Sequence, residues 1–527
     1  MRIGQDDSLN YDAILCEELI DPLLSIRVSS YLLKWVVPRL KAVPIILLNS
    51  RGGFFGLAYE KKVLTLMNRE KPQIRLKEAL LILLMVAVVV GTGVIGLKIS
   101  PEVPILISIM LIMAWTKLQG FSWADIDHGF IEGIKNGIVP FLIFMLIGAL
   151  IAVWIASGII PSLMVFGFHM IDVHWFLPSV CIITTIVGAI IGSGFTIIST
   201  LGVAFMGMGI TMHINPAMIV GAILCGAIFG DKASPLSATN NLCASVAHAN
   251  LTAHIKNLMW STVPALISTV IIFCFIGRGN GNVSLHSVNA TVAVLENHFS
   301  VTAWAAVPVI LLFVCAWGHI PTIAALFINV VVSTVMLLIE RPHFGVVNIN
   351  NMIVSGFKAR TGNARIDALL SRGGISSMMS TITLIIVALA LGGLLLHLGV
   401  IKAIMDPLSK HLHNDVSLII AVVLSGIGVN VFIGEQYLSD ILPAIAFRKT
   451  FQQHGLAPEA LSRAMEDGGT VINWIVPWGV AAAFAAKALG VPVLDYLPFD
   501  FFSLLSPVFS ILSGITGIGI KSLKDHP

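Results

Sequence analysis

Long apolar segments separated by short polar ones follow one another from about residue 79 to residue 520. A helix that crosses the hydrocarbon core of a bilayer needs about 20 predominantly apolar residues. By that criterion the pattern predicts about 11–12 transmembrane segments, so the expected fold class is an all-α polytopic membrane protein. The expected segments are 79–97, 103–118, 138–158, 176–210, 215–250, 257–277, 302–318, 320–339, 375–400, 415–447, 460–487 and 500–520.

Three of these segments, 176–210, 215–250 and 415–447, are too long for a single crossing and carry glycine or polar residues near their middle. Irregular backbone at membrane depth is tolerated where it is buried in protein or lines a polar cavity. Such interrupted segments are typical of the central helices of secondary transporters. We therefore expect discontinuous helices or re-entrant hairpins at the centre of the fold.

The composition agrees with a membrane protein, because 57% of the residues are hydrophobic and 11% are charged, whereas soluble domains carry about 25% charged residues. The formal net charge is only +3, and the basic residues are spread over the loops between apolar segments. Nucleic-acid binding therefore has no support from the charge distribution. The six cysteines are scattered without metal-ligand spacing and are expected to be small apolar packing residues.

Residues 1–78 are more polar than the rest, and we expect an N-terminal cytoplasmic segment there. An alternative is that translation begins at Met67, because MNREKPQIRLKE is a natural basic lead-in to the first apolar segment. Basic residues also occupy the loop 341–374 and the tail 521–527, whereas the loop 160–175 has no Lys or Arg. The positive-inside rule then predicts a multi-pass protein of the cell (inner) membrane with both termini in the cytoplasm.

A weak internal repeat relates the two halves of the chain. Gly192 aligns with Gly434, and Pro216 with Pro458, at the same offset of 242 residues. We therefore expect two pseudo-symmetric membrane repeats, 79–300 and 301–520, in either a parallel or an inverted arrangement. The residues expected to break helices in the equivalent regions 192–241 and 428–478 are Gly192, Gly194, Pro235, Gly434, Gly468, Gly469 and Pro477.

The segment GDKASPLSATNN, residues 230–241, is the strongest candidate for chemistry. It places the ionisable pair Asp231 and Lys232 between apolar runs, which is costly in a bilayer and therefore indicates a functional site. A polar turn between two spans is the simpler alternative. We expect Asp231 to bind either Na⁺ or H⁺, so that the two ions compete. Lys232 is expected to act as a charge partner that keeps Asp231 ionised.

Hard cations prefer carboxylate, hydroxyl, amide and carbonyl oxygens, and both broken regions offer these groups. The further residues expected to bind the ion are Ser234, Ser237, Thr239, Asn240, Asn430, Glu435, Asp467, Thr470 and Asn473. Asp467 has the alternative reading of a helix-end residue before two glycines. Glu466 follows a basic loop, and we expect it to be a solvated salt-bridge partner.

The segments GDKASPLSATNN, GEQYLSDILP, GLAPEALSRAMEDGGTVINWIVPWG and GVPVLDYLPFDFFSLLSP resemble the NhaC-type Na⁺/H⁺ antiporter family, within the ion-transporter superfamily of inverted-repeat secondary carriers. The resemblance covers about residues 75–520. It implies exchange of Na⁺ for H⁺ by alternating access, with these ions as transported or coupling ions and no resident cofactor. Some members of this family couple Na⁺ and H⁺ to organic substrates. The alternative function is therefore a Na⁺-coupled carrier of a small organic acid or amino acid, such as a malate/lactate antiporter.

The chain departs from the family pattern at Ala238, where an acidic residue is often found. It also departs at Ile472, Asn473 and Trp474, where small residues are expected. These departures leave the substrate open. A membrane-embedded enzyme is not expected, because the chain has neither a His-Glu-x-x-His helix nor a Gly-x-Gly-Asp stretch. A channel is a further alternative, although paired broken segments favour a carrier. The expected partners are the lipid bilayer, Na⁺, H⁺ and a small organic solute, and a homodimer is left open.

Overall fold

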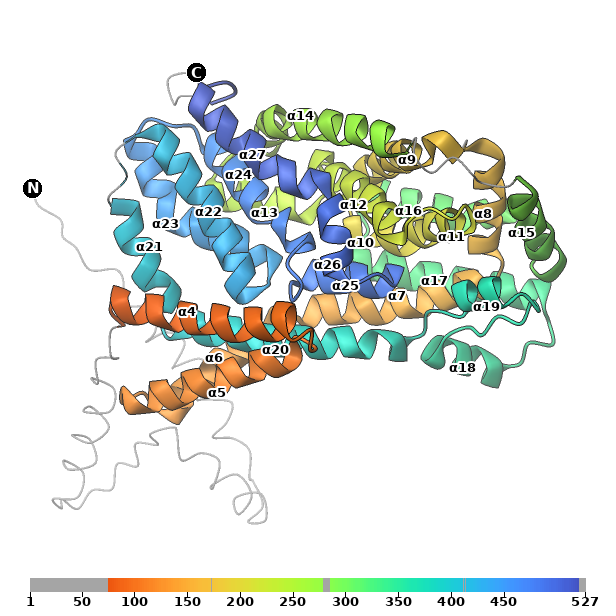
Figure 1. Ribbon diagram of the computed structural model, residues 1–527, viewed down its shortest axis with the longest axis horizontal. Coiled ribbons are helices and arrows are strands. Elements are labelled where there is room, and N and C mark those ends of the chain that lie inside the picture. Colours follow the sequence, from red (N-terminus) through yellow and green to blue (C-terminus); the bar gives the residue numbers. More distant parts are fainter. Residues whose placement is uncertain (1–73, 172, 278–284, 411, 413, 521–527) are drawn as a thin grey trace, which may run out of the picture. The chain divides into compact units, whose positions relative to one another are not determined.

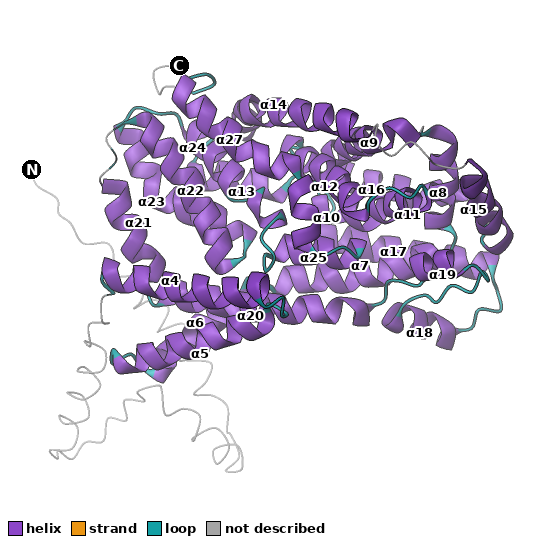
Figure 2. Cartoon of the chain, in the orientation of Figure 1, coloured by secondary structure: helices purple, strands orange, loops and turns teal. Residues whose placement is uncertain are grey.

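The computed structural model describes residues 74–171, 173–277, 285–410, 412 and 414–520, all of which lie in a compact unit formed by Pro72–Pro527. Every regular element in this described part is a helix, as the sequence predicts (Figures 1 and 2). The predictions for residues 1–73, including the start at Met67, and for the tail 521–527 lie outside the described residues.

The helices of the first half follow the apolar pattern closely. They are α4 (Leu76–Gly91), α5 (Glu102–Leu118), α6 (Trp123–Lys135), α7 (Ile138–Ala156), α8 (Ile159–Met170), α9 (Phe176–Ile191), α10 (Gly194–Ile197), α11 (Val203–Thr211), α12 (Pro216–Ala233), α13 (Ala238–Ala247) and α14 (Leu251–Gly277). A π-helical turn, Ile198–Gly202, joins α10 to α11, so Gly194–Thr211 is one continuous helical stretch.

The first half ends with α15 (Leu285–His298). The helices of the second half are α16 (Ala306–Trp317), α17 (Thr322–Glu340), α18 (Val346–Ser355), α19 (Ala364–Leu370), α20 (Ile375–His397), α21 (Val400–Lys410), α22 (Asp415–Ile433), α23 (Gln436–Gln453), α24 (Pro458–Gly468), α25 (Val480–Leu489), α26 (Val493–Tyr496) and α27 (Phe501–Thr516). Helices from the two halves pack together, since α27 contacts both α12 and α14, and α13 contacts α24 (Figure 1).

Within the described residues, eight helices are long and apolar enough to cross a membrane, or up to ten if each of two sharply bent helix pairs counts as one span. The bent pairs turn by 88° between α15 and α16 and by 91° between α25 and α26. The sequence count of eleven to twelve is higher because it included shorter apolar helices such as α9 and α27. The described part is therefore a multi-pass helical membrane fold with discontinuous helices.

The predicted helix breaks have equivalent geometry in the two halves. Gly192 ends α9 and Gly434 ends α22, with positive φ angles of 70° and 73° that glycine adopts without strain. The next residues cap the following helices, because Ser193 accepts a hydrogen bond from the Thr196 amide and Glu435 accepts one from the Leu438 amide. The 242-residue offset therefore relates two local structures as well as two sequences.

Helix packing beside the breaks repeats at the same offset. Gly226 of α12 lies so close to α9 that a Cβ there would be 2.2 Å from the Cys181 carbonyl oxygen. Gly468 of α24 lies against α22 in the same way, because a Cβ there would be 2.3 Å from the Val423 carbonyl oxygen. These two close backbone contacts explain why glycine occupies both positions.

Three stretches expected to be loops contain helices. Most of the predicted loop 160–175 belongs to α8, because Gly158 turns the chain with a positive φ of 74° and the helix resumes directly. The loop 341–374 contains α18 and α19, and the stretch after α20 contains α21. Helix α6 is amphipathic: Ile126 is buried, whereas Asp127 and His128 are exposed.

Candidate ion-binding site

A cavity of about 100 Å³ lies where the two sets of helix breaks meet α7. Its two acidic residues are Asp231 and Glu435, and its described lining contains no Lys, Arg or His. The lining is Val139, Pro140, Ile143, Phe144, Gly192, Ser193, Phe195, Asp231, Leu236, Ala238, Thr239, Thr322, Glu435, Gln436, Tyr437 and Val480. Of the residues predicted to bind the ion, this cavity brings together Asp231, Thr239 and Glu435.

Asp231 reaches the cavity because it lies in the last turn of α12, just before the chain breaks at Pro235. Its side chain is largely buried, with 8% exposure. The Gly194 backbone N–H, at the start of α10, and the Ser237 hydroxyl both interact with the carboxylate. A helix N-terminus carries partial positive charge and favours an anion, so α10 helps to hold a carboxylate at this position.

Glu435 reaches the same cavity from the second half. It is the N-cap of α23, and its Oε2 accepts a hydrogen bond of 2.7 Å from the Leu438 amide. Only 2% of its surface is exposed. Each half thus contributes one buried carboxylate that contacts the start of a helix, although the two residues are not equivalent in the 242-residue alignment.

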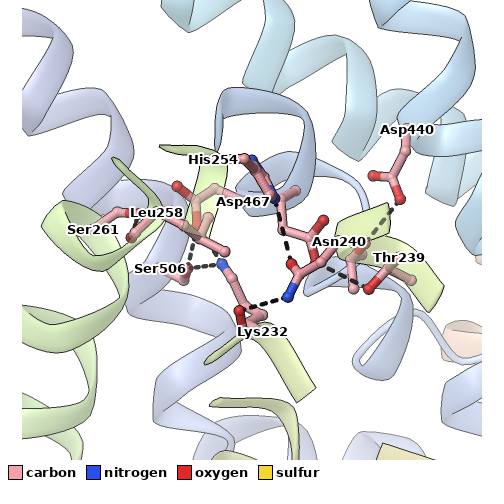
Figure 3. A network of polar contacts seen from close by, with 11 residues as sticks. Lys232, Thr239, Asn240, His254, Leu258, Ser261, Asp440, Asp467 and Ser506 are labelled. Atoms are coloured by element: carbon pink, nitrogen blue, oxygen red, sulfur yellow. Dashed lines mark hydrogen bonds and ion pairs between the residues drawn. The ribbon is translucent and has the colours of Figure 1, made fainter. Parts of the chain in front are cut away.

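Lys232 forms its ion pair with Asp467 of α24 rather than with the adjacent Asp231 (Figure 3). The Nζ–Oδ1 distance is 2.5 Å, and both side chains are fully buried. Ser506 of α27 completes the group, accepting from Lys232 at 3.1 Å and donating to Asp467 at 2.7 Å. Lys232 thus forms its ion pair away from Asp231, as the separation of about 100° between adjacent helical residues allows. Its role as a counter-charge that keeps Asp231 ionised stays a prediction.

The three predicted asparagines satisfy backbone groups freed by the helix breaks. Asn240 donates to the carbonyls of Lys232 at 2.8 Å and Ser234 at 2.7 Å, at the end of α12. Asn430 donates to the Gly469 carbonyl at 2.6 Å. Asn473 donates to the Gly434 carbonyl at 3.1 Å and to the Asn430 side chain at 2.8 Å. The last carbonyls of a helix need such partners, so these amides fix the broken backbone and do not line the cavity.

The other predicted hydroxyls are not among the residues that line the cavity, and each bonds to another polar group. Ser234 accepts from the Leu236 amide at 3.3 Å, and Ser237 lies 2.9 Å from the Thr239 hydroxyl. Thr470 donates to Asp440 at 2.8 Å. Their predicted role as ion ligands therefore stays a prediction, whereas their bonds to other polar groups are now defined.

Glu466 differs from the sequence expectation. It was expected to be a solvated partner of the basic loop, but its side chain is fully buried and accepts a hydrogen bond of 3.2 Å from Thr239. The reason is that α24 is packed against α13, α14, α22, α23 and α27, so that nearly all of its residues are buried. Sequence proximity to Arg463 and Lys449 gave no indication of this burial.

Sequence reasoning also missed Ser506, although a signal was present. Ser503, Ser506, Ser510 and Ser513 recur at a spacing of three to four residues, which places them on one face of α27. All four are buried in the structure. A polar stripe on an otherwise apolar helix indicates a face that contacts other polar groups, and here that face contacts the Lys232–Asp467 pair.

The multi-pass helical fold, its paired helix breaks and a small acidic cavity between them define the class of secondary membrane carriers. Comparison with known families is more specific, because the sequence profile of the Na⁺/H⁺ antiporter family matches residues 226–518. The chain belongs to this family, in its NhaC-type branch.

Relatives with curated names agree with this assignment. The chain is 38% identical to the Na⁺/H⁺ antiporter NhaC of Alkalihalophilus pseudofirmus, over 84% of this chain and 95% of the relative. It is 36% identical to NhaC of Bacillus subtilis, over 79% of this chain and 93% of that protein. It is also 31% identical to the malate-2H⁺/Na⁺-lactate antiporter of Bacillus subtilis, over 77% of this chain and 87% of that protein. All three relatives are named as antiporters and not as enzymes.

Proposed function

We propose that this protein exchanges Na⁺ for H⁺ by alternating access, and that the two ions compete for Asp231. The observation that carries the proposal is the small cavity that places Asp231 and Glu435 at the helix breaks of the two halves. A carboxylate there can take either a proton or Na⁺, so the arrival of one ion releases the other. Na⁺ and H⁺ are the transported ions in this scheme, and the chain acts as a carrier rather than an enzyme.

The cavity also favours an inorganic cation over an organic acid. An organic anion needs a cationic partner, whereas the described lining offers two carboxylates and no Lys, Arg or His. The volume of about 100 Å³ is smaller than the roughly 150 Å³ that accommodates a benzene molecule. Exchange of malate or lactate, as named for one relative, is therefore the second candidate, supported by that likeness alone.

The proposal includes a cellular setting. We infer a multi-pass protein of the cell (inner) membrane, with both termini cytoplasmic as the positive-inside rule predicts. The NhaC-type relatives and the eight to ten apolar helices support a membrane location.

The test is transport by purified protein in proteoliposomes that contain a pH-sensitive dye. With a pH gradient imposed, external Na⁺ should change the internal pH for the wild type. Asp231→Asn should reduce this response at least about tenfold, because the amide cannot exchange a proton for Na⁺. Asp127→Asn removes an exposed carboxylate of α6 and should leave the response unchanged. Full activity of Asp231→Asn would refute the role of Asp231.

A further inference from the structure

A second group of carboxylates, on α23 and α24, lies next to the cavity but outside its lining, because Thr239 lines the cavity and bonds to Glu466. Asp440, Glu466 and Cys243 place one ligand atom each within 4.8 Å of the others, and all three residues are buried. Asp440 and Glu466 have no exposed surface. Neither residue lines the cavity that contains Asp231, and neither belongs to the set that the sequence predicts for ion binding.

Each of these two carboxylates has one oxygen without a partner. Asp440 Oδ1 and Glu466 Oε2 are buried and make no hydrogen bond, while Thr470 donates to Asp440 Oδ2 and Thr239 donates to Glu466 Oε1. A buried acceptor that lacks a partner is costly, and more so when it is ionised. The free oxygens therefore indicate a missing positive charge between the side chains.

No cationic side chain in the described part of the chain supplies that charge directly. Lys232 attracts Glu466 electrostatically, but its Nζ is bonded to Asp467 and Ser506. Among the described residues, neither Asp440 nor Glu466 takes part in an ion pair (Figure 3 shows Asp440 apart from the Lys232–Asp467 pair). Two like charges this close need a cation between them to remain ionised together.

We propose that Asp440 and Glu466 form a second binding site for one Na⁺ ion, with Thr239 and Thr470 as additional oxygen ligands. Oxygen ligands of a hard cation such as Ca²⁺ lie at about 2.3–2.6 Å, so ligands on opposite sides are about 4.6–5.2 Å apart. The observed grouping within 4.8 Å fits this span. The two carboxylates and two hydroxyls together offer about six oxygens, a number that suits a hard cation.

Cys243 borders the site but is a poor ligand for such an ion, because thiol sulfur prefers softer metals. Its thiol interacts with both carboxylates, and the residue also packs in an apolar cluster with α22, α23 and α24. The preference of sulfur for softer metals can be tested, since replacing the sulfur with oxygen should strengthen binding of Na⁺ and weaken binding of a thiophilic metal.

The inference rests on the proposed function, in which Na⁺ enters the protein from the cavity.

The experiment is equilibrium binding of ²²Na⁺ to the purified full-length protein in detergent. The wild type should bind two Na⁺ per chain. Asp440→Asn and Glu466→Gln should each bind one, and Asp231→Asn should also bind one, having lost the cavity site instead. Thr470→Val keeps the shape of the side chain and should weaken the second site by about tenfold, as expected for a lost contact to a charged group. Cys243→Ser should tighten it.

Asp127→Asn is the matched control and should bind two ions. Retention of one Na⁺ by Asp440→Asn and Glu466→Gln would also show that these variants fold. A single Na⁺ in the wild type that both variants retain would overturn the inference, because the carboxylates would then share a proton instead. The inference would also be overturned if Asp440→Asn and Glu466→Gln bound no Na⁺ and Thr470→Val lost both ions together, because the substitutions would then act on the whole protein and not on one site. If Asp231→Asn still binds two Na⁺ ions while Asp440→Asn binds one, the proposed site at Asp231 in the cavity is refuted, and the second site stands.

Discussion

At the residue scale, the buried pair of Lys232 and Asp467 gives a direct test of how the two halves are held together. Removing one partner of a buried ion pair leaves an uncompensated charge and costs about 3–5 kcal/mol. Lys232→Met should therefore lower the thermal unfolding temperature of the purified protein strongly. The double variant Lys232→Met/Asp467→Asn removes both charges and should recover most of the loss. Equal destabilisation by the single and double variants would contradict the pairing.

The same pair shows what sequence can and cannot predict about single residues. Asp231 and Lys232 are conspicuous because they are charges within an apolar run, and both are buried as predicted. Their partners are not visible in the sequence, because 235 residues separate Lys232 from Asp467. Glu466 was misjudged for the same reason. Its surroundings depend on which helices pack against α24, and the sequence near Glu466 does not indicate which helices these are.

At the element scale, the break between α9 and α10 should be more sensitive to substitution than a glycine turn in open space, such as Gly399. An alanine Cβ at Gly192 would lie 2.7 Å from the Ser234 hydroxyl and 2.9 Å from the Leu236 Cβ. A left-handed backbone costs a non-glycine residue about 1–2 kcal/mol, to which this clash adds. Gly399 has a similar positive φ of 81°, but a Cβ there meets open space.

We therefore expect Gly192→Ala to impair both stability and Na⁺-dependent proton movement, whereas Gly399→Ala should show only the smaller backbone cost. The comparison separates strain at the turn from contact between the two broken segments. Thermal unfolding in detergent and transport in proteoliposomes are the measurements. If both variants lose the same stability and activity, the close packing of the break against the α12–α13 link is not important.

The elements themselves were largely predictable, since glycine and proline at Gly192, Pro235 and Gly434 mark helix breaks that the structure shows. Helix α8 was missed for a physical reason. The apolar run continues past Gly158, and its polar end resembles a loop, so only the turn at Gly158 separates α8 from α7. Amphipathic α6 was missed because it is too polar for a span criterion, although its capping residue Ser122 was a usable signal.

At the scale of the whole molecule, the decisive property is which solute drives proton movement. We expect Na⁺ alone to dissipate a pH gradient across proteoliposomes, and malate or lactate to change that rate by less than about twofold. The reason is that the cavity is small and carries two carboxylates without a cationic group among its described lining residues, so that hard cations are its natural ligands. Protein-free liposomes and the Asp231→Asn variant are the controls.

The opposite outcome would be equally informative about the molecule. If no proton movement occurs until one organic acid is present, the protein couples Na⁺ to that solute, and the cavity must enlarge during the transport cycle. Ala238 is then the first residue to examine, because it lines the cavity beside the two carboxylates. Ala238→Asp should in that case weaken transport of the organic anion by charge repulsion, while Na⁺/H⁺ exchange by a simple antiporter would tolerate the added carboxylate.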